Sequence, residues 1–172
     1  NRGYAYLKLS EYKSAITDFS TAIKLDPNNA LAYANRGSAY LALEKYESAI
    51  SDYSVLIKMD PNNALAYANR GHAYLDLEQY KSAITDFSTA IKLDPNDKDY
   101  YVNRGLAYLM LSKYKSAITD FSTAIKLDPN NALAYANRGY AYLCLKQYKS
   151  AITDTSMAIK LDPNNALVYN NR

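Results

Sequence analysis

Apolar and polar residues alternate along this chain with a helical spacing, in paired segments that short polar turns separate. Between Ala30 and Leu43, apolar or small residues recur every three or four positions, on one face of a helix. A second segment with the same spacing runs from Tyr46 to Ile57, and little more than Glu44–Lys45 separates the two. Helices joined by so short a turn fold back on each other, so the sequence predicts an antiparallel helical hairpin.

The end of this hairpin is marked by the run Asp60-Pro61-Asn62-Asn63. A proline disfavours helical backbone in the residue before it, so the second helix is expected to end at Asp60. The two asparagines supply turn and N-cap chemistry, and we therefore expect the next hairpin to begin directly after them.

The whole pattern returns every 34 residues, a period typical of helical repeat proteins. The phrase Asn-Arg-Gly opens each period, and residues 171–172 open a sixth; the complete periods are 1–34, 35–68, 69–102, 103–136 and 137–170. One hairpin cannot bury its apolar side alone, whereas stacked hairpins share a continuous core. The sequence therefore predicts a single all-α solenoid over residues 1–172 rather than five domains.

The repeated residues resemble the tetratricopeptide repeat signature, Trp-x-x-Leu-Gly-x-x-Tyr, then Ala-x-x-x-Phe, then Pro. The fourth period carries this spacing in the residues Tyr101, Arg104, Gly105, Tyr108, Ala117, Phe121 and Pro129. Two departures are systematic, because Tyr replaces the Trp and Arg replaces the Leu. The resemblance implies a right-handed superhelical solenoid of antiparallel helical hairpins, whose first helices line a concave groove.

The repeated residues also suggest internal contacts. A glycine inside a helix, such as Gly37, costs about 1 kcal/mol relative to Ala, and close approach of the second helix at Ala49 is the expected compensation. An arginine that is partly buried needs a partner, and an Asp recurs in every second helix, so we expect Arg36 to pair with Asp52. In the last period Thr155 replaces the aromatic residue of the others, and looser packing is expected around it.

Comparison of the five copies indicates where selectivity would lie. Two positions of the first helix vary freely, the residue after the glycine and the residue four further on. They are Tyr4, Ser38, His72, Leu106 and Tyr140, and then Lys8, Ala42, Asp76, Met110 and Cys144. Residues at this spacing share one helix face, and the asparagine before each arginine joins the same stripe, as Asn35, Asn69, Asn103 and Asn137.

The resemblance implies that this stripe faces the groove and binds a protein or peptide. Asparagine amides can donate to and accept from a peptide backbone, and the varied positions would then select the side chains. Drift at unconstrained surface positions is the alternative, although Leu106, Met110 and Tyr140 are more apolar than such drift favours. The subfamily that clamps a C-terminal carboxylate has Lys or Arg beside such asparagines. Here the residues one turn earlier are Leu31, Leu65 and Leu133. A chaperone-tail adaptor is therefore not expected.

Charge and composition bear on the other classes of function. The net charge is +3, from 20 basic and 17 acidic residues, which argues against nucleic acid as a partner. No apolar run approaches the roughly 20 residues that span a bilayer, so no membrane partner is expected. His72 lies four residues before Asp76, but no nucleophile or further ligands accompany them, and no catalytic site, metal or cofactor is expected. A Ser/Thr stripe is expected on the solvated face of the second helix, as Ser14, Thr17, Ser20 and Thr21.

The single cysteine and the two ends leave alternatives open. Cys144 cannot form an internal disulfide, which fits the cytosol without excluding the exterior. The sequence begins inside a first helix, and 165–172 contains the turn that is missing at the start. The chain could be a piece of a longer array, natural or designed. Alternatively, copies stack head to tail into a filament, which would suit an extracellular location.

Overall fold

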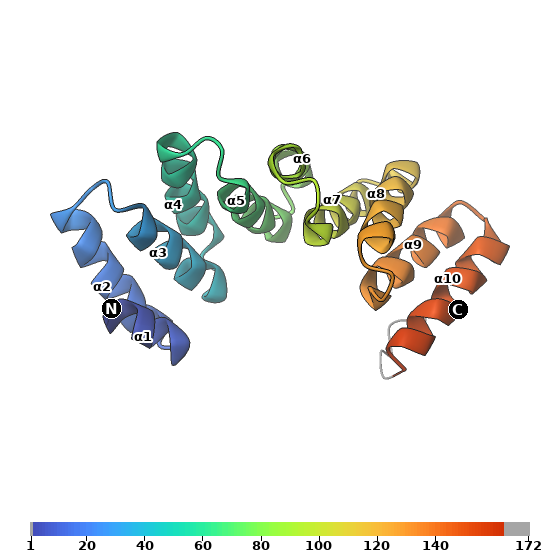
Figure 1. Ribbon diagram of the computed structural model, residues 1–172, viewed down its shortest axis with the longest axis horizontal. Coiled ribbons are helices and arrows are strands. Elements are labelled where there is room, and N and C mark those ends of the chain that lie inside the picture. Colours follow the sequence, from blue (N-terminus) through green and yellow to red (C-terminus); the bar gives the residue numbers. More distant parts are fainter. Residues whose placement is uncertain (1, 164–172) are drawn as a thin grey trace. The chain divides into compact units, whose positions relative to one another are not determined.

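The structure is a computed structural model that describes residues 2–163. These residues form ten α-helices and no strand (Figure 1). The helices are α1 (Arg2–Lys8), α2 (Tyr12–Leu25), α3 (Ala30–Ala42), α4 (Tyr46–Met59), α5 (Ala64–Asp76), α6 (Tyr80–Leu93), α7 (Lys98–Met110), α8 (Tyr114–Leu127), α9 (Ala132–Cys144) and α10 (Tyr148–Leu161). They belong to two compact units, Asn1–Leu93 with α1–α6 and Asp94–Arg172 with α7–α10. The expected all-α fold of antiparallel helical hairpins is confirmed.

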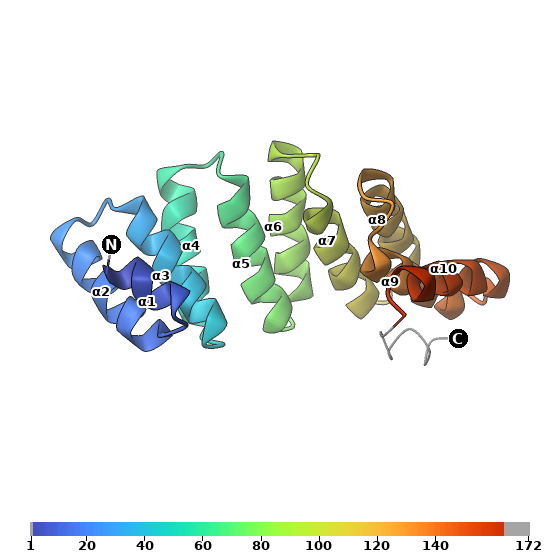
Figure 2. The ribbon, with the colours of Figure 1, turned by 60° about the horizontal axis from the view of Figure 1, so that its bottom comes forward.

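The described helices pair as five hairpins, and the repeated Arg-Gly lies inside the first helix of each one. The period boundaries remain a prediction. Within a unit, each first helix contacts the next first helix, α1 with α3, α3 with α5, and α7 with α9. Among the described residues, the second helices of a unit make no comparable contact with one another. First helices therefore form an inner layer and second helices an outer layer in each unit (Figures 1 and 2). A single solenoid over residues 1–172 remains a prediction.

The helix ends follow the expected local chemistry. The side chain of Asn63 caps α5 by accepting a hydrogen bond from the Ala66 amide at 2.9 Å, and Asn29 and Asn131 cap α3 and α9 in the same way. At the other end of the hairpin, Glu44 takes a left-handed backbone with φ 56°. The Glu44 amide then donates to the Leu41 carbonyl and the Lys45 amide to the Tyr40 carbonyl, at 2.9 and 2.8 Å. This Schellman pattern ends the first helix and reverses the chain.

The core of each unit is shared between consecutive hairpins, as the stacking argument predicts. In the first unit, Tyr53 and Leu56 of one hairpin pack with Ala66 and Ala73 of the next. In the second unit, Phe121 and its neighbours pack with Ala134 of α9. In these hairpins the apolar side is therefore buried jointly with a neighbouring hairpin.

The repeated glycines make room for an aromatic ring from the second helix. A Cβ atom added at Gly37 would lie 2.9 Å from Cζ of Tyr53, and one at Gly105 would lie 2.7 Å from Cε1 of Phe121. The expected close approach is present, but its nearest atoms come from the ring and not from Ala49. Ala49 is fully buried in the same core cluster as Tyr53, and at Gly139, where no ring is present, the Ala151 carbonyl oxygen lies 3.4 Å from the added Cβ.

Replacing Gly105 with Ala is expected to lower the free energy of unfolding by about 1–3 kcal/mol, because the added Cβ overpacks the Phe121 ring. Alanine's intrinsic helix preference, worth about 1 kcal/mol, works against this loss. The control is Gly139→Ala, where the nearest atom is the Thr155 hydroxyl at 3.0 Å and no ring is present. Urea unfolding followed by circular dichroism should show a clearly larger loss for Gly105→Ala; equal losses would contradict the ring contact.

Thr155 occupies the place of the aromatic ring in the last described hairpin. Its side chain is 2% exposed, and its hydroxyl donates to the Ala151 carbonyl at 2.8 Å. The substitution therefore leaves no buried polar atom unsatisfied at this position. Looser packing around Thr155 remains a prediction.

Candidate peptide-binding face

The repeated arginines join helices of two consecutive hairpins. In the first unit, Nε and Nη2 of Arg36 donate to both carboxylate oxygens of Asp52, at 2.9 and 2.7 Å. The expected Arg–Asp pair is thus confirmed, as a bidentate one. Nη1 of Arg36 also donates to the hydroxyl of Ser20 in the preceding hairpin, at 3.0 Å. Hydrogen bonding to Asp52 raises the pKa of Arg36 and keeps the guanidinium charged.

Two tyrosines of the same helix enclose each of these guanidinium groups. Cζ of Arg36 lies 5.6 Å from the Tyr33 ring centre and 5.8 Å from that of Tyr40. The same arrangement holds at Arg70, Arg104 and Arg138. Cation–π contact within about 6 Å is attractive. The Tyr that replaces the signature Trp therefore contacts the Arg that replaces the signature Leu.

The Ser/Thr stripe of the second helices is only partly a solvated surface. The hydroxyls of Thr17 and Thr21 are exposed and donate to carbonyls four residues earlier, as is usual on a helix. Ser20, in contrast, is half-buried and accepts the hydrogen bond from Arg36. Ser54 and Ser122 accept from Arg70 and Arg138 in the same manner. The expectation of a wholly solvated face was wrong for this position of the repeat.

In the first unit, the structure places the expected groove residues on α1, α3 and α5 of the inner layer. Tyr4 is 51% exposed on α1, and the Lys8 ammonium lies 5.2 Å from its ring centre. The remaining members are Asn35 and Ser38 on α3, and Asn69, His72 and Asp76 on α5. Asp76 is exposed, whereas Asn35, Asn69 and His72 are half-buried.

The position after the glycine has a second role that the sequence did not reveal. The Ser38 hydroxyl lies 3.1 Å from the Tyr53 hydroxyl, and the His72 ring meets the Phe87 ring edge-on, with centres 5.4 Å apart. Leu106 packs against the cluster that contains Phe121. In these three hairpins the side chain at this position therefore packs beside the aromatic residue of the second helix, in addition to any contact with a ligand.

In the second unit, α7 carries Asn103, Leu106 and Met110, and α9 carries Asn137, Tyr140 and Cys144. Met110 and Tyr140 are 59% and 42% exposed, whereas Cys144 is half-buried. Hydrogen bonding to Cys144 raises the pKa of Tyr140. Asn103 and Asn137 each donate to the carbonyl four residues earlier, at 2.7 and 2.9 Å. These two amides are thus oriented by their own helix.

Exposed leucines complete the stripe, although they were not among the expected groove residues. Leu31, Leu65 and Leu133 lie one turn before an asparagine on the same helix face. They are 72%, 62% and 51% exposed. The signal was present in the sequence, as a large apolar residue repeated four positions before the groove asparagine. The same position holds Asp99 in the fourth copy, so it also varies among the copies.

A cavity of about 260 Å³ opens among these leucines between α3, α4 and α5. Its lining comprises Ala30, Leu31, Ala34, Tyr53, Leu56, Asn63, Leu65, Ala66 and Asn69, none of them charged. At the corresponding positions of α7, charged residues stand in place of Ala30 and Leu31, namely Lys98 and Asp99. The Lys98 ammonium also forms an ion pair with Asp128, which raises the pKa of Lys98. The apolar site thus belongs to the first unit.

Comparison with known proteins places this arrangement in a family. A family model described as TPR repeat matches residues 3–44, 37–77, 71–112 and 111–145, and one described as Tetratricopeptide repeat matches residues 132–165. The chain belongs to the tetratricopeptide repeat family. No curated protein matches the sequence of this tetratricopeptide repeat chain.

Solved tetratricopeptide repeat structures share the fold. A crystal structure of MamA has a TM-score of 0.91 at 24% identity, covering 96% of this chain and 97% of that one. YrrB, described as a TPR protein with an unusual peptide-binding site, has a TM-score of 0.85 at 23% identity, covering 98% and 87%. The first TPR of Spaghetti (RPAP3), bound to the HSP90 peptide SRMEEVD, has a TM-score of 0.62 at 30% identity, covering 64% and 88%.

The part of this tetratricopeptide repeat chain that the structure describes offers little for other chemistry. Within residues 2–163, no group of three His, Cys, Asp or Glu side chains is placed to hold a metal ion. Over the same residues, no helix is long and apolar enough to cross a membrane.

Proposed function

We propose that this tetratricopeptide repeat protein is a non-catalytic scaffold that binds a peptide or protein segment along its first helices. The observation that carries the proposal is the uncharged cavity beside Leu31 and Leu65, with Asn69 in its lining. A partner would place an apolar side chain in the cavity, and the asparagine amides would hydrogen-bond its backbone. Tyr4, Lys8, Ser38, His72 and Asp76 would adjust selectivity around it. In the second unit, the same role falls to Asn103, Leu106, Met110, Asn137, Tyr140 and Cys144.

The related structures support a peptide as the ligand class, because Spaghetti and YrrB are both described with peptide-binding sites or bound peptides. The Spaghetti ligand, SRMEEVD, is acidic. In this chain the inner-stripe positions of α3 and α5 hold no Lys or Arg, and the nearby Arg36 and Arg70 are already paired with Asp52 and Asp86. An uncharged, apolar segment therefore fits this face better than an acidic tail.

A peptide library selected on the chain provides the test. Leu65→Asp is expected to lower the affinity for a selected peptide by roughly tenfold to a hundredfold, the range for the loss of one buried leucine contact. Because Leu65 is 62% exposed, this change should leave the fold intact, which circular dichroism would verify. The matched control is Leu9→Asp, since Leu9 is 68% exposed on the same unit but off the stripe.

Equal affinities of the Leu65→Asp and Leu9→Asp variants, measured by fluorescence anisotropy, would contradict the proposal. So would selected peptides that are uniformly acidic at their C-terminus. A further control is Thr85→Asp on the exposed side of α6, which should leave peptide affinity unchanged.

A further inference from the structure

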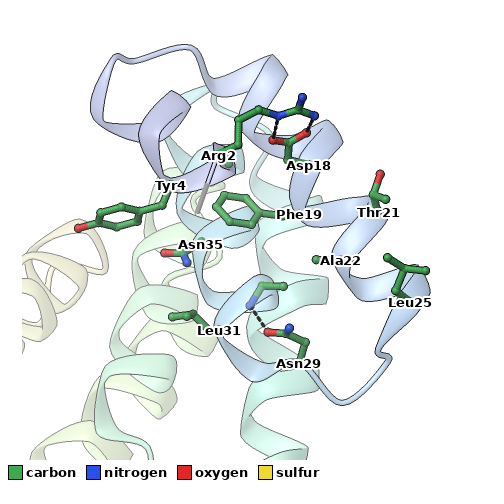
Figure 3. A pocket seen from close by; sticks show the side chains of 12 residues that line it. Arg2, Tyr4, Asp18, Phe19, Thr21, Ala22, Leu25, Asn29, Leu31 and Asn35 are labelled. Atoms are coloured by element: carbon green, nitrogen blue, oxygen red, sulfur yellow. Dashed lines mark hydrogen bonds and ion pairs between the residues drawn. The ribbon is translucent and has the colours of Figure 1, made fainter.

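The stripe of groove residues on α3 and α5 changes its chemistry along its length. At the first turns of the two helices it forms the uncharged cavity beside Leu31 and Leu65. Leu31 and Asn35 also line the neighbouring cavity between α1, α2 and α3, and Figure 3 shows them on the same side of α3. On α5 the stripe continues from Leu65 through Asn69 to Asp76, whose side chain is exposed. A segment lying along the stripe would therefore meet an apolar site at one end and a carboxylate at the other.

Asp76 and Glu44 together form the acidic end of the stripe. Asp76 is the last residue of α5, and Glu44 is exposed in the turn that follows α3. Both carboxylates act on the hydroxyl of Tyr46: burial raises the pKa of Tyr46, and the charges of Asp76 and Glu44 raise it further. Neither α3 nor α5 has a basic residue in its last turn, so the partial negative charge of both helix ends adds to the two carboxylates. This end of the stripe therefore favours a cation.

The acidic end distinguishes the first unit from the second. The turns after α3 and α5 read Leu-Glu-Lys and Leu-Glu-Gln, so Lys45 faces two glutamates and Asp76 in this part of the chain. The corresponding turns of the second unit read Leu-Ser-Lys and Leu-Lys-Gln, with two lysines and no acidic residue. Met110 and Cys144 hold the positions that correspond to Asp76. The unit that has the uncharged cavity is thus also the one that has the acidic end.

We propose, on the basis of the peptide-binding function proposed above, that the segment bound by the first unit pairs an apolar residue in the cavity with a lysine or arginine at the acidic end. Asp76 follows Asn69 by seven positions and Leu65 by eleven. With a helical rise of about 1.5 Å per residue, these separations are about 10–16 Å along α5. An extended peptide advances by about 3.3 Å per residue. The basic residue is therefore expected about three to five residues from the apolar one.

A peptide library with one fixed leucine and randomised flanking positions, selected on the full chain, tests this inference. The selected peptides should be enriched in Lys or Arg about three to five residues from the leucine. Asp76→Asn should lower the affinity for such a peptide by roughly twofold to fivefold, the range for one exposed ion pair. Replacing the basic residue of the peptide with Gln should abolish the difference between Asp76→Asn and the parent chain.

Two further variants separate a local ion pair from a general effect of charge. Thr85→Lys changes the net charge by the same amount as Asp76→Asn but lies on the exposed side of α6, so it should leave the affinity unchanged. Lys45→Gln should raise the affinity for a basic peptide, because it removes the positive charge next to Glu44. The side chain of Lys45 makes no capping hydrogen bond to α4, so this change should leave the fold intact.

Selected peptides that lack a basic residue at this spacing would overturn the inference. Equal affinities of Asp76→Asn and the parent chain for a basic peptide would also overturn it. In both cases the proposed peptide-binding function would still stand if Leu65→Asp lowered the affinity. A library that yields no binding peptide would overturn the inference and the proposed function together.

Discussion

Replacing Asp86 with Ala is expected to lower the free energy of unfolding by about 3–5 kcal/mol, the cost of leaving one partner of a buried ion pair alone. Asp86 is 3% exposed and accepts from Nε and Nη2 of Arg70, at 2.7 and 2.8 Å. Arg70 also donates to Ser54 of the preceding hairpin at 3.0 Å. Loss of the Asp86 carboxylate would therefore weaken both the α5–α6 hairpin and its contact with the α3–α4 hairpin.

The control for this prediction is Asp18→Ala, because the same pair is open to solvent at the start of the first unit. The Arg2 side chain is 75% exposed, compared with 19% for Arg70. Solvent screens exposed pairs, so a much smaller loss is expected there. Urea unfolding of both variants, followed by circular dichroism, makes the comparison, and similar losses would show that the Arg70–Asp86 pair has no special structural role.

The pH dependence of the stability that the Arg70–Asp86 pair contributes gives a further expectation for the same variant. Hydrogen bonding to Asp86 raises the pKa of Arg70 above its ordinary value. A basic group whose pKa is higher in the folded state stabilises the fold fully when the pH is below the pKa of the unfolded state. This stabilisation is lost only as the pH rises through the pKa of the folded state. The loss caused by Asp86→Ala should therefore be constant throughout the neutral range of pH.

Replacing Phe121 with Thr is expected to lower the free energy of unfolding by about 3–5 kcal/mol, as for other truncations of a buried ring. Phe121 is fully buried, lies against Gly105, and packs with Ala134 of the next hairpin. The variant places in the α7–α8 hairpin the residue type that the chain has at Thr155. The fall in its free energy of unfolding would measure how much the Phe121 ring contributes to the hairpin and to the stacking contact.

The reciprocal variant, Thr155→Phe, is the comparison that the chain itself offers. A ring at this position should raise the free energy of unfolding, because Gly139 leaves the same space on the first helix that Gly105 leaves for Phe121. Repeat arrays can unfold in stages, so hydrogen exchange of α8 and α10 should accompany the urea curves. A Phe121→Thr variant as stable as the parent chain would contradict the assigned role of the ring.

The sequence predicted those parts of the fold that local signals encode. Asn63 and Pro61 marked the boundary between hairpins because a cap and a helix stop act within a few residues. The Arg36–Asp52 pair followed from a charge in each helix that needed a partner. The two units still had to be found in the structure, since contacts between nearly identical hairpins give no local signal of a division.

The candidate site was predicted less completely, because its features depend on contacts between helices. Nothing local to Ser38 indicates that Tyr53 lies opposite, and the link from Ser20 to Arg36 crosses from one hairpin to the next. Leu31 and Leu65 were noted in the sequence only as apolar residues beside the groove asparagines, although this position also varies, to Asp99 in the fourth copy. Their exposure became visible only when the inner layer of helices was assembled.

The most direct test of the binding proposal is a footprint of a selected peptide, measured by hydrogen exchange of the complex and the free chain. Binding along the inner layer predicts new protection in α3 and α5 around Leu31, Leu65 and Asn69. The second helices should keep their exchange rates at the exposed threonines, such as Thr85. New protection confined to α4 and α6, with α3 and α5 unchanged, would contradict a scaffold that binds its partner through its first helices.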